Sequence, residues 1–124
     1  MVKVAVYGSL KRGFGNYPTM KRAEGQFVST AISNFNVVMD GHSYPYINET
    51  SNGHPMEVEI FDVPKDKLEG LDWLEGHPTF YKREVKSFIL EDGSKIEAWV
   101  YFLQSGVEAN ESLLRDGVYV WKES

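Results

Sequence analysis

The sequence contains no cysteine and only three histidines among its 124 residues. The absence of cysteine excludes disulfide bonds, thiolate zinc sites, a cysteine nucleophile and CxxC redox chemistry. His42, His54 and His77 form neither an i, i+4 pair nor an HExxH motif. Metal binding by histidines and carboxylates from distant loops stays open, but this spacing does not favour it. We therefore expect no metal site.

Long hydrophobic runs are also missing, since no stretch approaches the roughly 18 apolar residues that a membrane span needs. The apolar start of the chain, residues 1–7, is too short for a secretory signal. Acidic residues (18) outnumber basic ones (13), and the net charge of −5 disfavours nucleic acid and anionic membranes as general partners. We expect a cytoplasmic protein, and its size suits a monomer.

Composition and pattern predict one folded domain over residues 1–124, with 42% hydrophobic and 14% aromatic residues. The pattern predicts five or six strands and one clear helix, and strands and helices do not alternate along the chain. This favours an α+β domain of barrel-like or sheet-plus-helix type. The expected strands cover residues 2–7, 27–32, 35–39, 56–63, 83–90 and 95–103. Helices are expected over residues 18–23 and 65–74.

Turn signals separate these elements. Asp92-Gly93 lies between the last two predicted strands and is the favoured centre of a tight hairpin turn. Loops are expected over residues 40–45 and over the polar stretch 47–54, where Asn52-Gly53 marks a turn.

The first loop, which follows the first strand, is rich in glycine and flanked by positive charge. Residues 1–22 contain no acidic residue, and their basic residues are Lys3, Lys11, Arg12, Lys21 and Arg22. Outward-pointing N–H groups in such a turn suit an anion or a developing oxyanion. The alternative is a solvated basic face that happens to contain a tight turn. The loop matches neither the GxSxG nucleophile elbow nor the GxGxxG dinucleotide fingerprint.

A second candidate is Glu75, which lies near the predicted end of the second helix. The helix dipole disfavours negative charge there, and Trp73 and Leu74 precede it. The dipole and partly apolar surroundings from these two residues would both raise the pKa of its carboxyl group toward the range useful for general acid–base catalysis. The alternative is an ordinary exposed glutamate at a helix end.

Two motifs combine these features. The first is Val6-Tyr7-Gly8-Ser9-Leu10-Lys11-Arg12-Gly13, and the second is Leu71-Asp72-Trp73-Leu74-Glu75-Gly76 followed by Pro78, Tyr81 and Arg83. Together they resemble the Tyr-Gly-Ser/Thr-Leu and Leu-Asp-x-Leu/Phe-Glu-Gly-x-Pro-x-x-Tyr-x-Arg signatures of the γ-glutamylcyclotransferase-like family. The resemblance covers about residues 3–102 and is greatest to γ-glutamylamine cyclotransferase and its small bacterial and viral relatives.

This resemblance implies a small, partly closed mixed β-barrel with flanking helices, whose cavity is lined by the first loop. It also implies a cofactor-free reaction in which the substrate's α-amine attacks its own γ-amide carbonyl. The products are 5-oxoproline and a free amine or amino acid. Glu75 matches the family's catalytic glutamate, and Tyr7, Gly8, Ser9 and Leu10 match its substrate-binding loop.

Other residues are less firmly placed by the resemblance. Tyr81 is a candidate for the pocket wall, and Arg83 is interpreted as a structural partner of a carboxylate. The chain departs from the family at Val58-Glu59-Ile60-Phe61 and at its C-terminal pattern, which is displaced to 116–121. Because of these departures, the resemblance does not imply which amine is released from the substrate.

Two alternatives to this activity stay open. One is a non-catalytic domain on the same scaffold that binds a small anionic metabolite or a protein. The other is cleavage of a γ-glutamyl group from the side-chain amide of a biosynthetic intermediate. Retention of Glu75 favours an enzyme, because a binder of anions gains little from a buried carboxylate.

Overall fold

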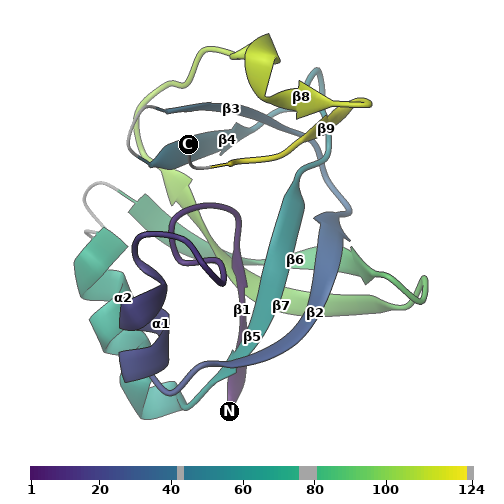
Figure 1. Cartoon of the computed structure of the whole chain (residues 1–124). Helices are drawn as coiled ribbons and strands as arrows, with labels where there is room; N and C mark the ends of the chain where they lie inside the picture. The colour runs from purple at the N-terminus through teal and green to yellow at the C-terminus, as the bar shows by residue number, and fades with distance from the viewer. Residues whose placement is uncertain (42–43, 76–80, 123–124) are drawn as a thin grey trace.

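Five strands close into a barrel in the computed structural model, which describes residues 1–41, 44–75 and 81–122, without the side chains of residues 73–75 (Figure 1). In barrel order the strands are β1 (Val2–Val6), β5 (Glu57–Val63), β2 (Gln26–Ser33), β6 (Tyr81–Leu90) and β7 (Lys95–Leu103). β1 pairs antiparallel with β5 and parallel with β7, and this parallel pair closes the barrel. The prediction of an α+β fold with a mixed barrel and flanking helices is therefore confirmed.

The second half of β1 is buried on both faces. Along β1, Ala5 packs in one hydrophobic cluster, while Val4 and Val6 pack in a second cluster beneath the helices. This alternation follows from the two-residue period of a strand, which sends successive side chains to opposite faces. The second cluster joins the strands to Leu68 and Leu71, and thereby seats a helix on the barrel.

Two helical segments flank the barrel (Figure 1). α1 (Tyr17–Arg22) carries a proline in its first turn, as predicted, and buries Met20. The second predicted helix consists of a 3₁₀ turn, η1 (Lys65–Lys67), followed by α2 (Leu68–Glu75). None of the helices in the described ranges is long and apolar enough to span a membrane.

The predicted hairpin between β6 and β7 is confirmed. Gly93 adopts a positive φ of 87°, and its N–H donates to the Leu90 carbonyl at 2.9 Å. The hydroxyl and the N–H of Ser94 both donate to the carboxylate of Asp92, and these hydrogen bonds lower the pKa of Asp92. The turn is thus specified by its own residues.

The predictions between residues 35 and 54, and after residue 103, need correction. Two small antiparallel sheets lie over one end of the barrel, and a short 3₁₀ turn precedes the second (Figure 1). Their elements are β3 (Val37–Gly41), β4 (Pro45–Glu49), η2 (Glu111–Leu113), β8 (Leu114–Arg115) and β9 (Val118–Tyr119). The sequence analysis expected loops over most of 40–54 and no strand after 103.

The missed strand β4 owes its conformation to distant partners. Ile47 is fully buried in the first cluster, while the side-chain amide of Asn48 donates to the carbonyls of Leu103 and Ser105. The Asn48 amide oxygen in turn accepts the Val107 N–H at 2.7 Å. These long-range bonds compensate for the weak strand propensity of a segment rich in polar residues.

Candidate active site

The first loop, residues 7–16, lies between the helices and the small sheets (Figure 1). The Lys11 N–H donates to the Gly8 carbonyl at 3.0 Å, which closes a tight turn around Ser9 and Leu10. Asn16 secures Ser9 twice, through its backbone N–H to the Ser9 carbonyl (2.8 Å) and through its side-chain amide to Oγ (2.9 Å). The loop is therefore held in one shape by its own polar groups.

Three backbone donors of this loop are not used by the turn. Within the described residues, the N–H groups of Gly8, Ser9 and Leu10 donate no hydrogen bond. Such adjacent donors suit an anion or a developing oxyanion. That Tyr7, Gly8, Ser9 and Leu10 bind substrate stays a prediction, and this geometry is compatible with it.

Gly8 is in close contact with Pro45, the first residue of β4. A β-carbon added at Gly8 would lie 2.3 Å from Cγ and 2.5 Å from Cδ of Pro45, so only glycine fits there. The hydroxyl of the buried Tyr81 donates to the Pro45 carbonyl at 3.3 Å. Tyr81, which the sequence analysis proposed for the pocket wall, is therefore linked to the first loop through Pro45, which contacts both Gly8 and Tyr81.

Tyr7 and α2 are both attached to β7. The Tyr7 hydroxyl donates to the Tyr101 carbonyl at 2.7 Å, and this bond is buried. The Tyr101 hydroxyl and the Arg83 Nε both donate to Oδ1 of Asp72, each at 2.7 Å. Arg83 thus pairs with a carboxylate of the fold, as the sequence analysis expected.

Glu75 is the last residue of α2, where the sequence analysis placed it. Its side chain lies outside the described part, so the proposed rise in its pKa stays a prediction. The predicted motif residues Gly76 and Pro78 and the histidines His42 and His77 also lie outside the described residues.

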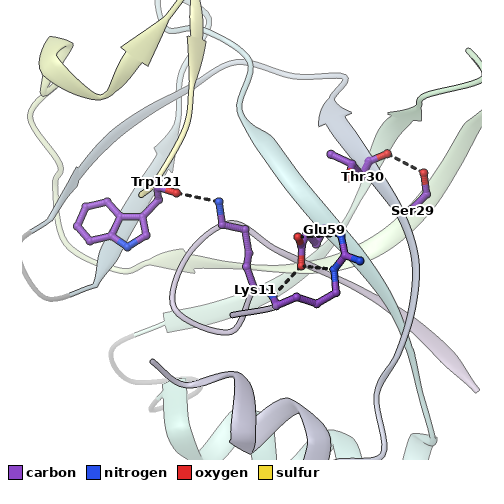
Figure 2. Close-up of polar contacts among 6 residues, drawn as sticks. Lys11, Ser29, Thr30, Glu59 and Trp121 are labelled. Carbon is purple, nitrogen blue, oxygen red and sulfur yellow. Dashed lines mark hydrogen bonds and ion pairs between the residues drawn. The ribbon is translucent and has the colours of Figure 1, made fainter. Parts of the chain in front are cut away.

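The basic residues of the first loop are engaged within the fold. Lys11 is only 4% exposed, and its ammonium donates to the Trp121 carbonyl at 2.8 Å (Figure 2). The same ammonium lies over the Phe14 ring. The Arg12 N–H donates to the Glu59 carboxylate at 2.8 Å, and the Arg12 guanidinium pairs with the same group. Lys11 is therefore not part of a solvated basic face, which was the alternative interpretation of this segment.

The Lys11–Trp121 bond predicts an effect on stability. Lys11→Met keeps the buried stem but leaves the Trp121 carbonyl without this donor, and an unsatisfied buried group costs about 1–3 kcal/mol. We expect a lower midpoint of thermal unfolding, measured by circular dichroism, whereas Lys21→Met at an exposed position should leave it unchanged. An unchanged midpoint for Lys11→Met would contradict the anchoring role of this bond.

Among the residues that the structure describes, no group of three or more histidine, cysteine, aspartate or glutamate side chains could hold a metal ion. His54 is exposed and packs edge-on against the Tyr119 ring.

The sequence analysis missed three residues that organise this region. Asp72 and Tyr101 link the helix to the barrel, and Glu59 holds the far end of the first loop. Asp72 offered one signal, since it is an acidic residue between Leu71 and Trp73 of the second motif. Glu59 was noted only within the segment that departs from the family pattern, and Tyr101 offered no signal, because the partners of both residues are set by the fold.

Comparison with known proteins places these features in a family. A family model described as gamma-glutamyl cyclotransferase, AIG2-like, matches residues 4–122. A Methanocaldococcus jannaschii protein, named provisionally as a gamma-glutamylcyclotransferase, is 37% identical over 103 residues, covering 82% of this chain and 84% of that protein. Gamma-glutamylaminecyclotransferase C of Danio rerio is 33% identical over 110 residues, covering 79% of this chain and 72% of that protein.

A solved structure agrees with these matches. The crystal structure of an AIG2-like protein from Mus musculus superposes with a TM-score of 0.75 at 27% sequence identity, covering 86% of this chain and 80% of that one.

Proposed function

The chain belongs to the AIG2-like gamma-glutamyl cyclotransferase family, and on this basis we propose that it releases 5-oxoproline from a γ-glutamylamine. The observation that carries the proposal is the match over residues 4–122, which includes both the first loop and the helix that ends at Glu75. The relative from Danio rerio is named for γ-glutamylamines, which supports an amine such as the lysine side chain as the leaving group.

The reaction is an intramolecular acyl transfer. The α-amine of the glutamyl group attacks its own γ-carbonyl carbon, a C–N bond forms, and the C–N bond to the leaving amine breaks. Near neutrality the α-amine is mostly protonated, with a reference pKa of about 8, so a base must first remove a proton. The leaving amine must gain a proton as it departs, and the reaction needs neither water nor a redox partner.

Glu75 fills both proton-transfer roles in this proposal. Its carboxylate takes the proton from the α-amine and, as a carboxylic acid, returns it to the departing nitrogen. The N–H groups of Ser9 and Leu10 bind the γ-carbonyl oxygen as it becomes an oxyanion, and one such donor contributes about 3–4 kcal/mol to a transition state. Because attacker and target belong to one molecule, holding the substrate folded supplies much of the remaining acceleration.

The test is an assay of 5-oxoproline release. The purified protein is incubated with γ-glutamyl-ε-lysine, with γ-glutamyl dipeptides and with glutathione, and 5-oxoproline is measured by mass spectrometry. We expect product from γ-glutamyl-ε-lysine. A folded protein that forms no 5-oxoproline from any of them would overturn the proposal and favour a binding domain on the same scaffold.

A further inference from the structure

The polar contact between α2 and the barrel converges on one carboxylate oxygen. Oδ1 of Asp72 accepts hydrogen bonds from the Tyr101 hydroxyl and the Arg83 Nε, both at 2.7 Å. Arg83 and Tyr101 face each other across the β6–β7 ladder, so the barrel itself places the two donors side by side. The Arg83 guanidinium also lies over the Trp99 ring, with its Cζ 4.4 Å from the ring centroid, which restricts its orientation.

Burial makes this cluster stronger than a surface ion pair. The side chains of Arg83 and Asp72 are 22% and 14% exposed, whereas those of Lys3 and Asp62, which pair at the same distance, are 38% and 32% exposed. Charges less exposed to water are screened less by it, and hydrogen bonds to a charged group are stronger than neutral ones. The directional bonds of Asp72 therefore fix how far α2 is rotated about its own axis.

The same residue of β7 also holds the first loop. The backbone carbonyl of Tyr101 accepts the buried Tyr7 hydroxyl at 2.7 Å, while its side-chain hydroxyl reaches Asp72. Tyr101 thus joins the loop to the helix through two hydrogen bonds, one to its backbone carbonyl and one from its side-chain hydroxyl. A shift of either element relative to the other would break one of them.

Glu75 lies three residues after Asp72, which is about 4.5 Å further along the helix axis. We propose that Asp72 and Tyr101 are positioning residues that set the distance and orientation between the first loop and the helix end that carries Glu75. This inference rests on the proposed function, because it assigns the cluster a purpose only if Glu75 transfers protons to a substrate held by the loop.

The first variant is Tyr101→Phe, which removes one hydroxyl and keeps the carbonyl that binds Tyr7. We expect kcat for 5-oxoproline release to fall about tenfold, because a base displaced by a fraction of an ångström loses alignment, while KM changes less than twofold. Asp72→Asn, which keeps the shape of the side chain but loses its charge, should also lower kcat. It provides the test if Tyr101→Phe does not fold. Asp62→Asn is the matched control, since it breaks an ion pair of equal length that joins β1 to β5 and bonds neither α2 nor the first loop, and it should leave kcat unchanged.

A double-mutant cycle separates positioning from a merely structural role. If Tyr101 acts through Glu75, then adding Tyr101→Phe to Glu75→Gln should cost no further activity, because no carboxylate remains to be placed. An equal tenfold loss in both backgrounds would overturn the proposal. So would a variant that melts earlier but keeps the wild-type kcat.

Hydrogen exchange tests the same positioning role without activity. Tyr101→Phe should speed the exchange of amides in α2, because it removes only the hydroxyl that bonds Asp72, whereas Asp62→Asn should not. Unchanged exchange in α2 of a folded Tyr101→Phe variant would overturn the positioning role. Absence of 5-oxoproline from the wild-type protein would instead overturn the proposed function, and that result is visible before any variant is made.

Discussion

Glu75→Gln is expected to fold, to bind γ-glutamyl substrate and to release 5-oxoproline about 10²- to 10⁴-fold more slowly, the usual contribution of general acid–base catalysis. A glutamine side chain has nearly the size of glutamate, so the end of α2 should keep its packing. Its amide can neither accept the proton of the α-amine nor donate one to the departing nitrogen. The measurement is kcat for γ-glutamyl-ε-lysine, with substrate binding followed by the rise in the unfolding midpoint that a ligand of the native state produces.

Glu69→Gln provides the matched control, since it makes the same substitution at an exposed position of the same helix. Its kcat should equal that of the wild type. If Glu75→Gln kept the wild-type rate, or if Glu69→Gln lost as much, Glu75 would not be the acid–base residue. A loss of substrate binding in Glu75→Gln would instead indicate that the carboxylate holds the substrate.

The parts of the fold that could be predicted from the sequence are those specified by neighbouring residues. Residues 95–103 form β7 as predicted, because their alternation is regular and Asp92-Gly93 supplies the turn before them. The start of η1 after Pro64 and the burial of Leu71 also follow from local pattern. Barrel closure could not be predicted in this way, since the parallel pairing of β1 with β7 joins the first and the last barrel strand along the chain.

The same distinction between local and distant residues applies to the candidate site. The first loop and Glu75 could be proposed from the sequence because each lies within a short contiguous motif. The groups that hold the loop could not, because they are distant in the sequence: Lys11 and the Trp121 carbonyl are 110 positions apart, and Tyr7 and the Tyr101 carbonyl are 94 apart. Only the strand register, which depends on the whole barrel, brings these groups together.

Gly8→Ala is expected to lower kcat/KM about 10²-fold without unfolding the protein. The added methyl group would lie 2.3 Å from Cγ of Pro45, which belongs to a ring and cannot rotate away. Pro45 is itself buried at the start of β4, and its carbonyl accepts the Tyr81 hydroxyl. The loop must therefore move, and a displacement of about 1 Å in groups that orient a substrate costs about this much. The measurement is kcat/KM for 5-oxoproline release.

Two further variants test whether this contact is the cause. Gly106→Ala adds the same methyl group after β7, where a β-carbon meets nothing within 4 Å, and should leave kcat/KM unchanged. Pro45→Ala removes both atoms that Gly8→Ala would strike, so the double variant should recover activity relative to Gly8→Ala alone. Wild-type kcat/KM in Gly8→Ala would show that the loop tolerates the shift. Failure of Pro45→Ala to restore activity in a folded double variant would show that the loss has another origin than this contact.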